Sequence, residues 1–252
     1  YDAFVLKPQA AAMKARQQVE RQIAETQGEE ALKIARGDAP LKVLSRDEAL
    51  ASGGRIQFDN GEVFGSINLD GGRIDDLSLH EYFKTLNNKD NVSVLSPRGT
   101  QHARSIEYGW LASGAGLNVP DKDTRWSVRG NDKLTPETPV TLVWNNGQGV
   151  EFVRTITLDK HYMFTVTQSV NNNSGREITL HPYGLLAQRG TPEGYQWMWI
   201  SHEGPVAFIG EDLHQPYYDD LREARDDKSK AELSYEAQTG WIGVTEKYWL
   251  SA

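Results

Sequence analysis

The sequence predicts a mainly β protein built from antiparallel sheets that pack face to face. From about Leu41 onward the hydropathy pattern has a period of two, as in residues 63–69, where apolar and polar side chains alternate. Turn signals recur between such runs, and Asp70-Gly71-Gly72 and Asn145-Asn146-Gly147 are two clear examples. Because no helical pattern separates these runs, the chain has the features of packed antiparallel sheets.

Residues 1–38 differ from the rest, and a helix is predicted over 9–36. Pro8 suits the first turn of a helix, and the alanines that follow are good helix formers. Within this helix, the large apolar residues before Gly28 are few: Met13, Val19 and Ile23. A helix that is polar nearly all round buries little surface, so residues 1–38 are expected to be a helical or partly disordered, membrane-proximal tether.

The folded body is expected to begin with strands joined by tight turns. The segments with the clearest strand patterns are 63–69 with 74–79, 140–144 with 150–158, and 162–170 with 178–180. The Asn146-Gly147 pair predicts a hairpin, since both residues tolerate a positive φ. Residues 219–232 carry mixed charges and are expected to form a solvated helix or loop.

Composition limits the classes of protein to which the chain can belong. No run approaches the ~18 consecutive apolar residues of a membrane span. The absence of cysteine excludes thiolate zinc sites, iron–sulfur clusters and cysteine nucleophiles. The formal net charge is −8, and residues 1–38 carry six basic and six acidic residues, so the excess lies in the body. An acidic body of this kind argues against non-specific binding to nucleic acid.

Several short motifs begin like known sites but lack an essential residue. His80-Glu81 and His202-Glu203 start like a zinc-protease helix, but Lys84 and Val206 stand where the second histidine is needed. The run from Asp121 to Asp132 starts like a calcium loop, yet it has a tryptophan at the position of the essential glycine. We therefore expect no metal site and no cofactor.

Two further groups of residues leave alternatives open. A few acids and histidines could converge in a cleft and act on sugars, although chance neighbours are expected among 35 acidic residues; these are Asp75, Asp76, His181, His202 and Glu203. Tyr195, Trp197 and Trp199 alternate along one possible strand, so they would share one face. That face could belong to the core, or it could line a groove for sugar or peptide.

The C-terminal residues are unusually rich in apolar and aromatic side chains. The candidates for an interaction surface near a membrane are Trp241, Ile242, Tyr248, Trp249 and Leu250. Tryptophan and tyrosine favour the boundary between water and hydrocarbon, because each side chain combines an apolar ring with a polar group. We expect this chain to be a part of a longer protein that meets something apolar here, although ordinary packing would also explain the pattern.

A set of strings occurs in a fixed order along the chain. They are Gly65–Leu79 with Tyr82, Val94–Pro97, Glu107–Trp110, Val143–Gly149, His202–Pro205, and Gly240–Gly243 with Lys247–Leu250. In this order the strings resemble the large periplasmic domain of the YidC/Oxa/Alb family of bacterial membrane protein insertases. The resemblance extends from about residue 40 to the C-terminus and is weakest over residues 1–38.

The resemblance implies a fold, a function and an organisation. The fold would be an antiparallel β-supersandwich of the galactose mutarotase type over residues 39–238. Residues 239–252 would form a short helical segment that leads to the next transmembrane helix. The whole protein would insert inner-membrane proteins and help them fold, alone or with Sec components such as SecF, without nucleotide, cofactor or catalytic residues in this domain. The alternative hypothesis is that the chain is a carbohydrate-binding or mutarotase-like enzyme domain.

Overall fold

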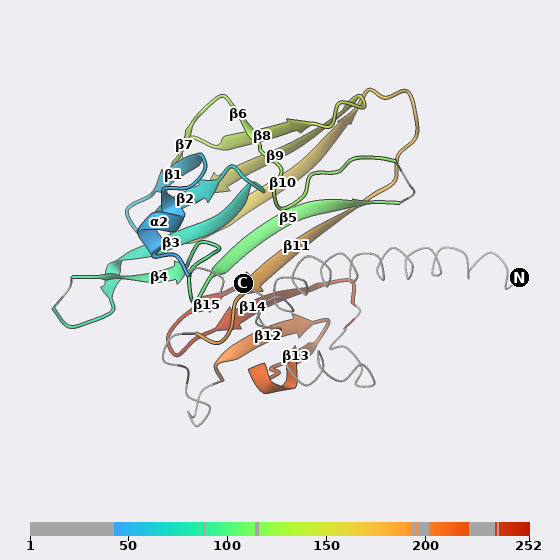
Figure 1. The fold of residues 1–252 in the computed structure, drawn as a ribbon. Coiled ribbons are helices and arrows are strands. Elements are labelled where there is room, and N and C mark those ends of the chain that lie inside the picture. Colours follow the sequence, from blue (N-terminus) through green and yellow to red (C-terminus); the bar gives the residue numbers. More distant parts are fainter. Residues whose placement is uncertain are drawn as a thin grey trace, which may run out of the picture. The chain divides into compact units, whose positions relative to one another are not determined.

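The computed structural model describes residues 43–87, 89–113, 116–192, 195, 202–221, 235 and 237–252. The tether expected over residues 1–38 lies outside this part of the chain. The structure divides into two compact units, Tyr1–Ala187 and Gln188–Ala252, and the boundary falls inside the body expected over 39–238. Each unit is described by itself (Figure 1).

A seven-stranded sheet forms one layer of the first unit, with the strand order β11-β5-β3-β2-β1-β7 and with β4 paired to β3. Its strands are β1 (Arg55–Asp59), β2 (Val63–Asn68), β3 (Arg73–Phe83), β4 (Asn91–Leu95), β5 (Arg104–Ala112), β7 (Lys133–Leu134) and β11 (Leu180–Gln188). Strand β2 pairs antiparallel with β1 and β3, as the period-two pattern predicted, and β7 adds a short parallel pairing to β1.

A four-stranded antiparallel sheet of order β10-β9-β8-β6 forms the second layer. Its strands are β6 (Ser127–Arg129), β8 (Val140–Asn145), β9 (Val150–Leu158) and β10 (Phe164–Asn172). The predicted hairpin is confirmed: β8 and β9 pair from Val140↔Ile156 to Asn145↔Glu151. Gly147 occupies its turn with a φ of 73°, which a glycine adopts without strain.

The hydrophobic core of the first unit lies between these two sheets. Phe58 on β1 meets Phe164 on β10 edge to face at 5.1 Å, and Trp110 on β5 meets Phe152 on β9 at the same centroid distance. The alternating side chains of β9 that face this core are buried. The expectation of antiparallel sheets packed face to face is therefore confirmed.

One charged side chain lies inside this core. Arg154 on β9 is 1% exposed and donates hydrogen bonds to the backbone carbonyls of Gly71, Gly72 and Tyr108. Its guanidinium also lies over the indole ring of Trp126. The residue thereby ties the β2–β3 turn to β5 and β9.

The first unit also contains a short helix, α2 (Arg46–Leu50). The Ser45 side chain accepts from the backbone N–H of Glu48, and the Glu48 carboxylate accepts from the backbone N–H of Ser45. This reciprocal capping box satisfies donors that the start of a helix leaves open. The helix brings Arg46 to β3, where it pairs with Asp76.

The second unit contains an antiparallel sheet of order β13-β12-β14-β15. Its strands are β12 (Gly204–Ile209), β13 (Asp212–His214), β14 (Gly240–Thr245) and β15 (Leu250–Ser251). Residues 218–221 are helical, and most of the mixed-charge run 219–232 lies outside the described residues.

The expectation of a helical segment at residues 239–252 is wrong, because these residues form the hairpin β14–β15. Strand β14 pairs with β12 along its full length, from Gly204↔Thr245 to Ile209↔Gly240, so its backbone groups are used in a sheet ladder. The backbone N–H of Glu246 donates to the carbonyl of Trp249 and closes the turn. No helix in the described part of the chain is long and apolar enough to cross a membrane.

Candidate functional site

An exposed row of large apolar side chains crosses three strands of the second unit. Phe208 on β12 lies opposite Leu213 on β13 and opposite Trp241 on β14. Directly opposed residues on neighbouring strands project from the same face of a sheet, so the three side chains are adjacent. Their exposed fractions are 57% for Leu213, 38% for Phe208 and 41% for Trp241. We call these three residues the apolar row.

The other predicted interaction residues lie on the same β14–β15 hairpin. Ile242 follows Trp241 on β14 and is exposed, and by the alternation of a strand its side chain lies on the opposite face from the row. Tyr248 in the turn and Leu250 on β15 are exposed, whereas Trp249 is half-buried. The structure thus gathers the five residues on one hairpin and distributes them over its two faces and its turn.

Two members of the row, Phe208 and Leu213, were missed by reasoning from the sequence. Their positions in the chain give no sign that they neighbour Trp241, since this depends on the pairing of β12 with β14 across the intervening segment. The alternation of Val206 and Phe208 indicates that the two share a face, yet Val206 is buried and Phe208 is exposed. The register of the strand pairs, and not the sequence pattern, shows that Phe208 lies between Leu213 and Trp241.

The predicted aromatic groove is described only in part. Tyr195 packs edge to face on Tyr218 with the ring centroids 5.1 Å apart, and Tyr218 is buried. The hydroxyl of Tyr218 accepts a hydrogen bond from Gln188. Trp197 and Trp199 lie outside the described residues, so the groove stays a prediction.

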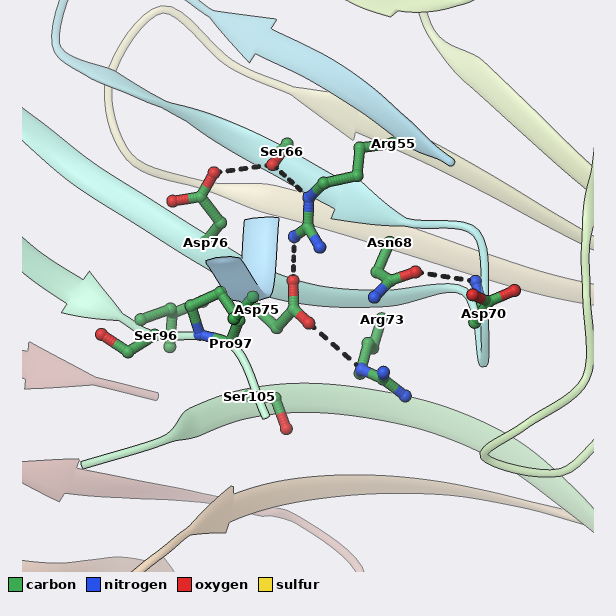
Figure 2. Close-up of polar contacts among 12 residues, drawn as sticks. Arg55, Ser66, Asn68, Asp70, Arg73, Asp75, Asp76, Ser96, Pro97 and Ser105 are labelled. Carbon is green, nitrogen blue, oxygen red and sulfur yellow. Dashed lines mark hydrogen bonds and ion pairs between the residues drawn. The ribbon is translucent and has the colours of Figure 1, made fainter. Parts of the chain in front are cut away.

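The first unit contains a buried ionic network on β1, β2 and β3 (Figure 2). The Asp75 carboxylate is almost completely buried and is paired with Arg55 and with Arg73, whose Nε lies 3.2 Å from Oδ2. Arg55 also donates from Nε to Ser66 Oγ at 2.7 Å. Two guanidinium groups therefore hold this carboxylate in a fixed position.

The neighbouring carboxylate, Asp76, is held in the same way. It accepts from Ser66 Oγ at 2.6 Å and forms an ion pair with Arg46 of α2. The β2–β3 register shifts between Ser66 and Ile67, and this bulge adds Asp75 to the strand beside Asp76. Both carboxylates that sequence reasoning considered for acid–base chemistry are thus engaged in ion pairs.

The remaining candidates for sugar chemistry lie in different surroundings. His181 on β11 of the first unit is hydrogen-bonded to Ser113 Oγ at 2.9 Å. In the second unit, His202 is hydrogen-bonded to the carbonyl of Pro205 at 2.8 Å, and Glu203 is buried beside β12. Among the described residues, no group of three or more histidine, aspartate or glutamate side chains is arranged to hold a metal ion.

Comparison with known proteins shows the family to which the chain belongs. The family model described as the YidC periplasmic domain matches residues 55–252. This chain belongs to the YidC family. A membrane protein insertase YidC from Bradyrhizobium diazoefficiens is 39% identical over 222 residues, which cover 86% of this chain and 34% of that protein.

Further insertases of the family give the same result. The protein from Ruegeria sp. is 44% identical over 196 residues, covering 75% of this chain and 32% of its own length. The protein from Beijerinckia indica is 42% identical over 218 residues, covering 84% and 35%. The chain therefore spans about a third of the length of these YidC relatives, and the resemblance read from the sequence is confirmed.

Proposed function

We propose that this chain is a non-catalytic spacer and contact module of an insertase that inserts inner-membrane proteins and helps them fold, alone or with the Sec translocon. The observation that carries the proposal is the apolar row in a chain that spans about a third of its insertase relatives. An exposed patch of neighbouring large apolar side chains favours a contact with another apolar surface. The domain would act on the periplasmic side of the inner membrane.

The remainder of the insertase polypeptide is the occupant that fits the row best. It is covalently linked to this chain, so its effective concentration is high and a contact of modest area suffices. The row itself contains no charged side chain, which suits the core of a protein contact. We also assign Ile242, Tyr248, Trp249 and Leu250 to this contact region. A SecF-like accessory component of the translocon is the second partner that we propose.

The ion pairs in the first unit support the non-catalytic part of the proposal. A general acid or base must exchange a proton with its substrate, and Asp75 and Asp76 are instead bound to guanidinium groups. This arrangement weighs against the carbohydrate-acting alternative. We expect no turnover of simple hexoses by the chain. Turnover that is lost in His181→Ala or His202→Ala would favour the alternative.

The contact can be tested by the accessibility of one residue of the row. The chain has no cysteine, so Leu213→Cys introduces a single thiol at an exposed position of the row. We expect this thiol to react with a maleimide in the isolated chain and to react at least about tenfold more slowly in a full-length insertase freed of its other cysteines. Thr167→Cys, on an exposed position of β10, is the control and should react at similar rates in both. Equal rates for Leu213→Cys in the two proteins would refute the contact.

A further inference from the structure

The hairpin formed by β3 and β4 extends beyond its neighbours in the first unit. Strand β2 begins at Val63, which pairs with Leu79, whereas β3 continues to Phe83. Residues 81–83 and the turn that follows therefore project past the start of β2, and in Figure 1 this hairpin reaches out from the rest of the first unit. We call residues 84–87 with Lys89 the hairpin tip.

The base of this hairpin is held by specific hydrogen bonds. The strands pair at Phe83↔Asn91, and the backbone N–H of Lys84 donates to the carbonyl of Asp90 at 2.8 Å. The register between β3 and β4 is irregular here, and the side-chain amide of Asn91 donates to the carbonyls of Leu79 and His80 at 2.7 and 3.0 Å. Because these bonds span the irregularity, they fix the direction in which the tip points.

The tip presents one apolar side chain between two cations. Leu86 is fully exposed, and Lys84 and Lys89 are exposed on either side of it. Within residues 84–89 the two lysines are the only charged residues, and the acidic Glu81 and Asp90 lie next to them toward the base of the hairpin. Its place at the end of a projecting hairpin puts this leucine where it can contact another surface.

Two exposed tyrosines and one exposed methionine lie near the base of this hairpin. Tyr82 is on β3, and Tyr162 and Met163 are in the turn between β9 and β10. The hydroxyl of Tyr162 donates to the Glu62 carboxylate at 3.0 Å, which places its ring beside the start of β2. Tyrosine rings favour the headgroup level of a membrane, while a leucine can reach deeper.

We propose that the hairpin tip inserts at the surface of a lipid bilayer that carries anionic headgroups. Leu86 would enter the edge of the hydrocarbon region, and the two lysines would reach lipid phosphates with their ammonium groups while their methylene stems lie along the apolar boundary. A single apolar side chain buries too little area for a stable protein interface, whereas even a weak membrane contact can orient a domain that is already held near a bilayer.

Such a contact is weak by itself and acts on a domain that is already tethered. One leucine and two lysines would orient the first unit relative to the bilayer without recruiting a free protein. The inference concerns the first unit alone and does not depend on the apolar row of the second unit. Either contact could therefore fail its test while the other stands.

The test uses the 252-residue chain bound through an N-terminal histidine tag to vesicles of phosphatidylethanolamine and phosphatidylglycerol (about 3:1) that contain a nickel-chelating lipid. Thr85→Cys gives a single labelling site for an environment-sensitive fluorophore beside an intact Leu86. We expect a blue shift of its emission, and quenching by brominated lipids at least about twofold stronger than for a label at Thr167→Cys. The combined change Lys84→Glu and Lys89→Glu, or Leu86→Asp alone, should reduce the quenching to the level at residue 167.

Several outcomes would overturn the proposal. Equal quenching at residues 85 and 167 would show that the tip stays in water. A signal that persists in Leu86→Asp would show that the fluorophore, and not the leucine, drives insertion. An undiminished signal on vesicles of phosphatidylcholine alone would remove the role of the lysines. If a photocrosslinker at residue 86 of a full-length insertase labelled a protein and no lipid, the tip would be a protein contact instead.

Discussion

The guanidinium of Arg154 lies 4.6 Å from the ring centroid of Trp126, inside the sandwich of the first unit. Burial is the main cause that lowers the pKa of Arg154 to about 10, since it disfavours the charged form. Three backbone carbonyls and the face of an aromatic ring surround this charge, and these groups offset part of the cost of burying it. The pair thus couples the β2–β3 turn to the core.

Arg154→Met should destabilise the first unit by about 3 kcal/mol, because it leaves the carbonyls of Gly71, Gly72 and Tyr108 without this donor in a buried place. Urea unfolding followed by tryptophan fluorescence measures the change. Arg176→Met, at an exposed position, is the control and should cost less than about 0.5 kcal/mol. A similar small effect for both would show that Arg154 is dispensable for stability.

Gly72→Ala should cost more stability than Gly147→Ala. Both glycines have a positive φ, 60° and 73°, so each alanine introduces backbone strain. A Cβ at residue 72 would also lie 2.6 Å from Arg154 Nη1, whereas a Cβ at residue 147 would meet nothing within 4 Å. The difference between the two midpoints of thermal unfolding isolates the steric effect. Equal losses would mean that strain alone matters at residue 72.

Asp75→Asn should destabilise the chain by about 3 kcal/mol, because it leaves the guanidinium groups of Arg55 and Arg73 without their buried counter-charge. The matched control is Asp70→Asn, which removes a solvent-exposed ion pair with Arg125 and should cost less than about 1 kcal/mol. Chemical denaturation at neutral pH compares the two. A larger loss for the exposed pair would contradict this account of the network.

Stability should fall as the pH is lowered from about 5 toward 3. The pKa of Asp159 is lowered by hydrogen bonds from the backbone N–H groups of Met163 and His161. The pKa of Glu151 is lowered by Arg129, and that of Glu48 by the backbone N–H of Ser45. A carboxylate whose pKa is lower in the folded state stabilises above its ordinary pKa, and this contribution is lost as it becomes protonated.

The variant Asp159→Asn tests one of these contributions. It should lower the melting temperature at pH 7 and reduce the acid-induced loss between pH 5 and 3. Thermal unfolding across this pH range gives both values. If the melting temperature of Asp159→Asn fell between pH 5 and 3 as steeply as that of the unchanged chain, Asp159 would contribute nothing to the acid-induced loss of stability.

The hairpin β8–β9 could be predicted from the sequence because local chemistry determines it: Asn146-Gly147 accommodates the turn and the alternating side chains set its faces. The same alternation places Arg154 in phase with Phe152 and Ile156, so its burial had a signal that reasoning from composition overlooked. By contrast, residues 240–245 form a short apolar run whose period does not distinguish a helix from a strand. Pairing with β12 decided the outcome there, and it also placed Phe208 beside Trp241.

The central claim is that the second unit connects this domain to insertion, and the insertion activity of two full-length variants tests it most directly. One variant carries Trp241→Ser and Trp249→Ser, and the other lacks residues 222–230. At matched expression, we expect the tryptophan variant to insert a reporter membrane protein at least about fivefold less efficiently than the deletion variant. Equal insertion by the two variants would contradict the claim and would return both tryptophans to a purely structural role.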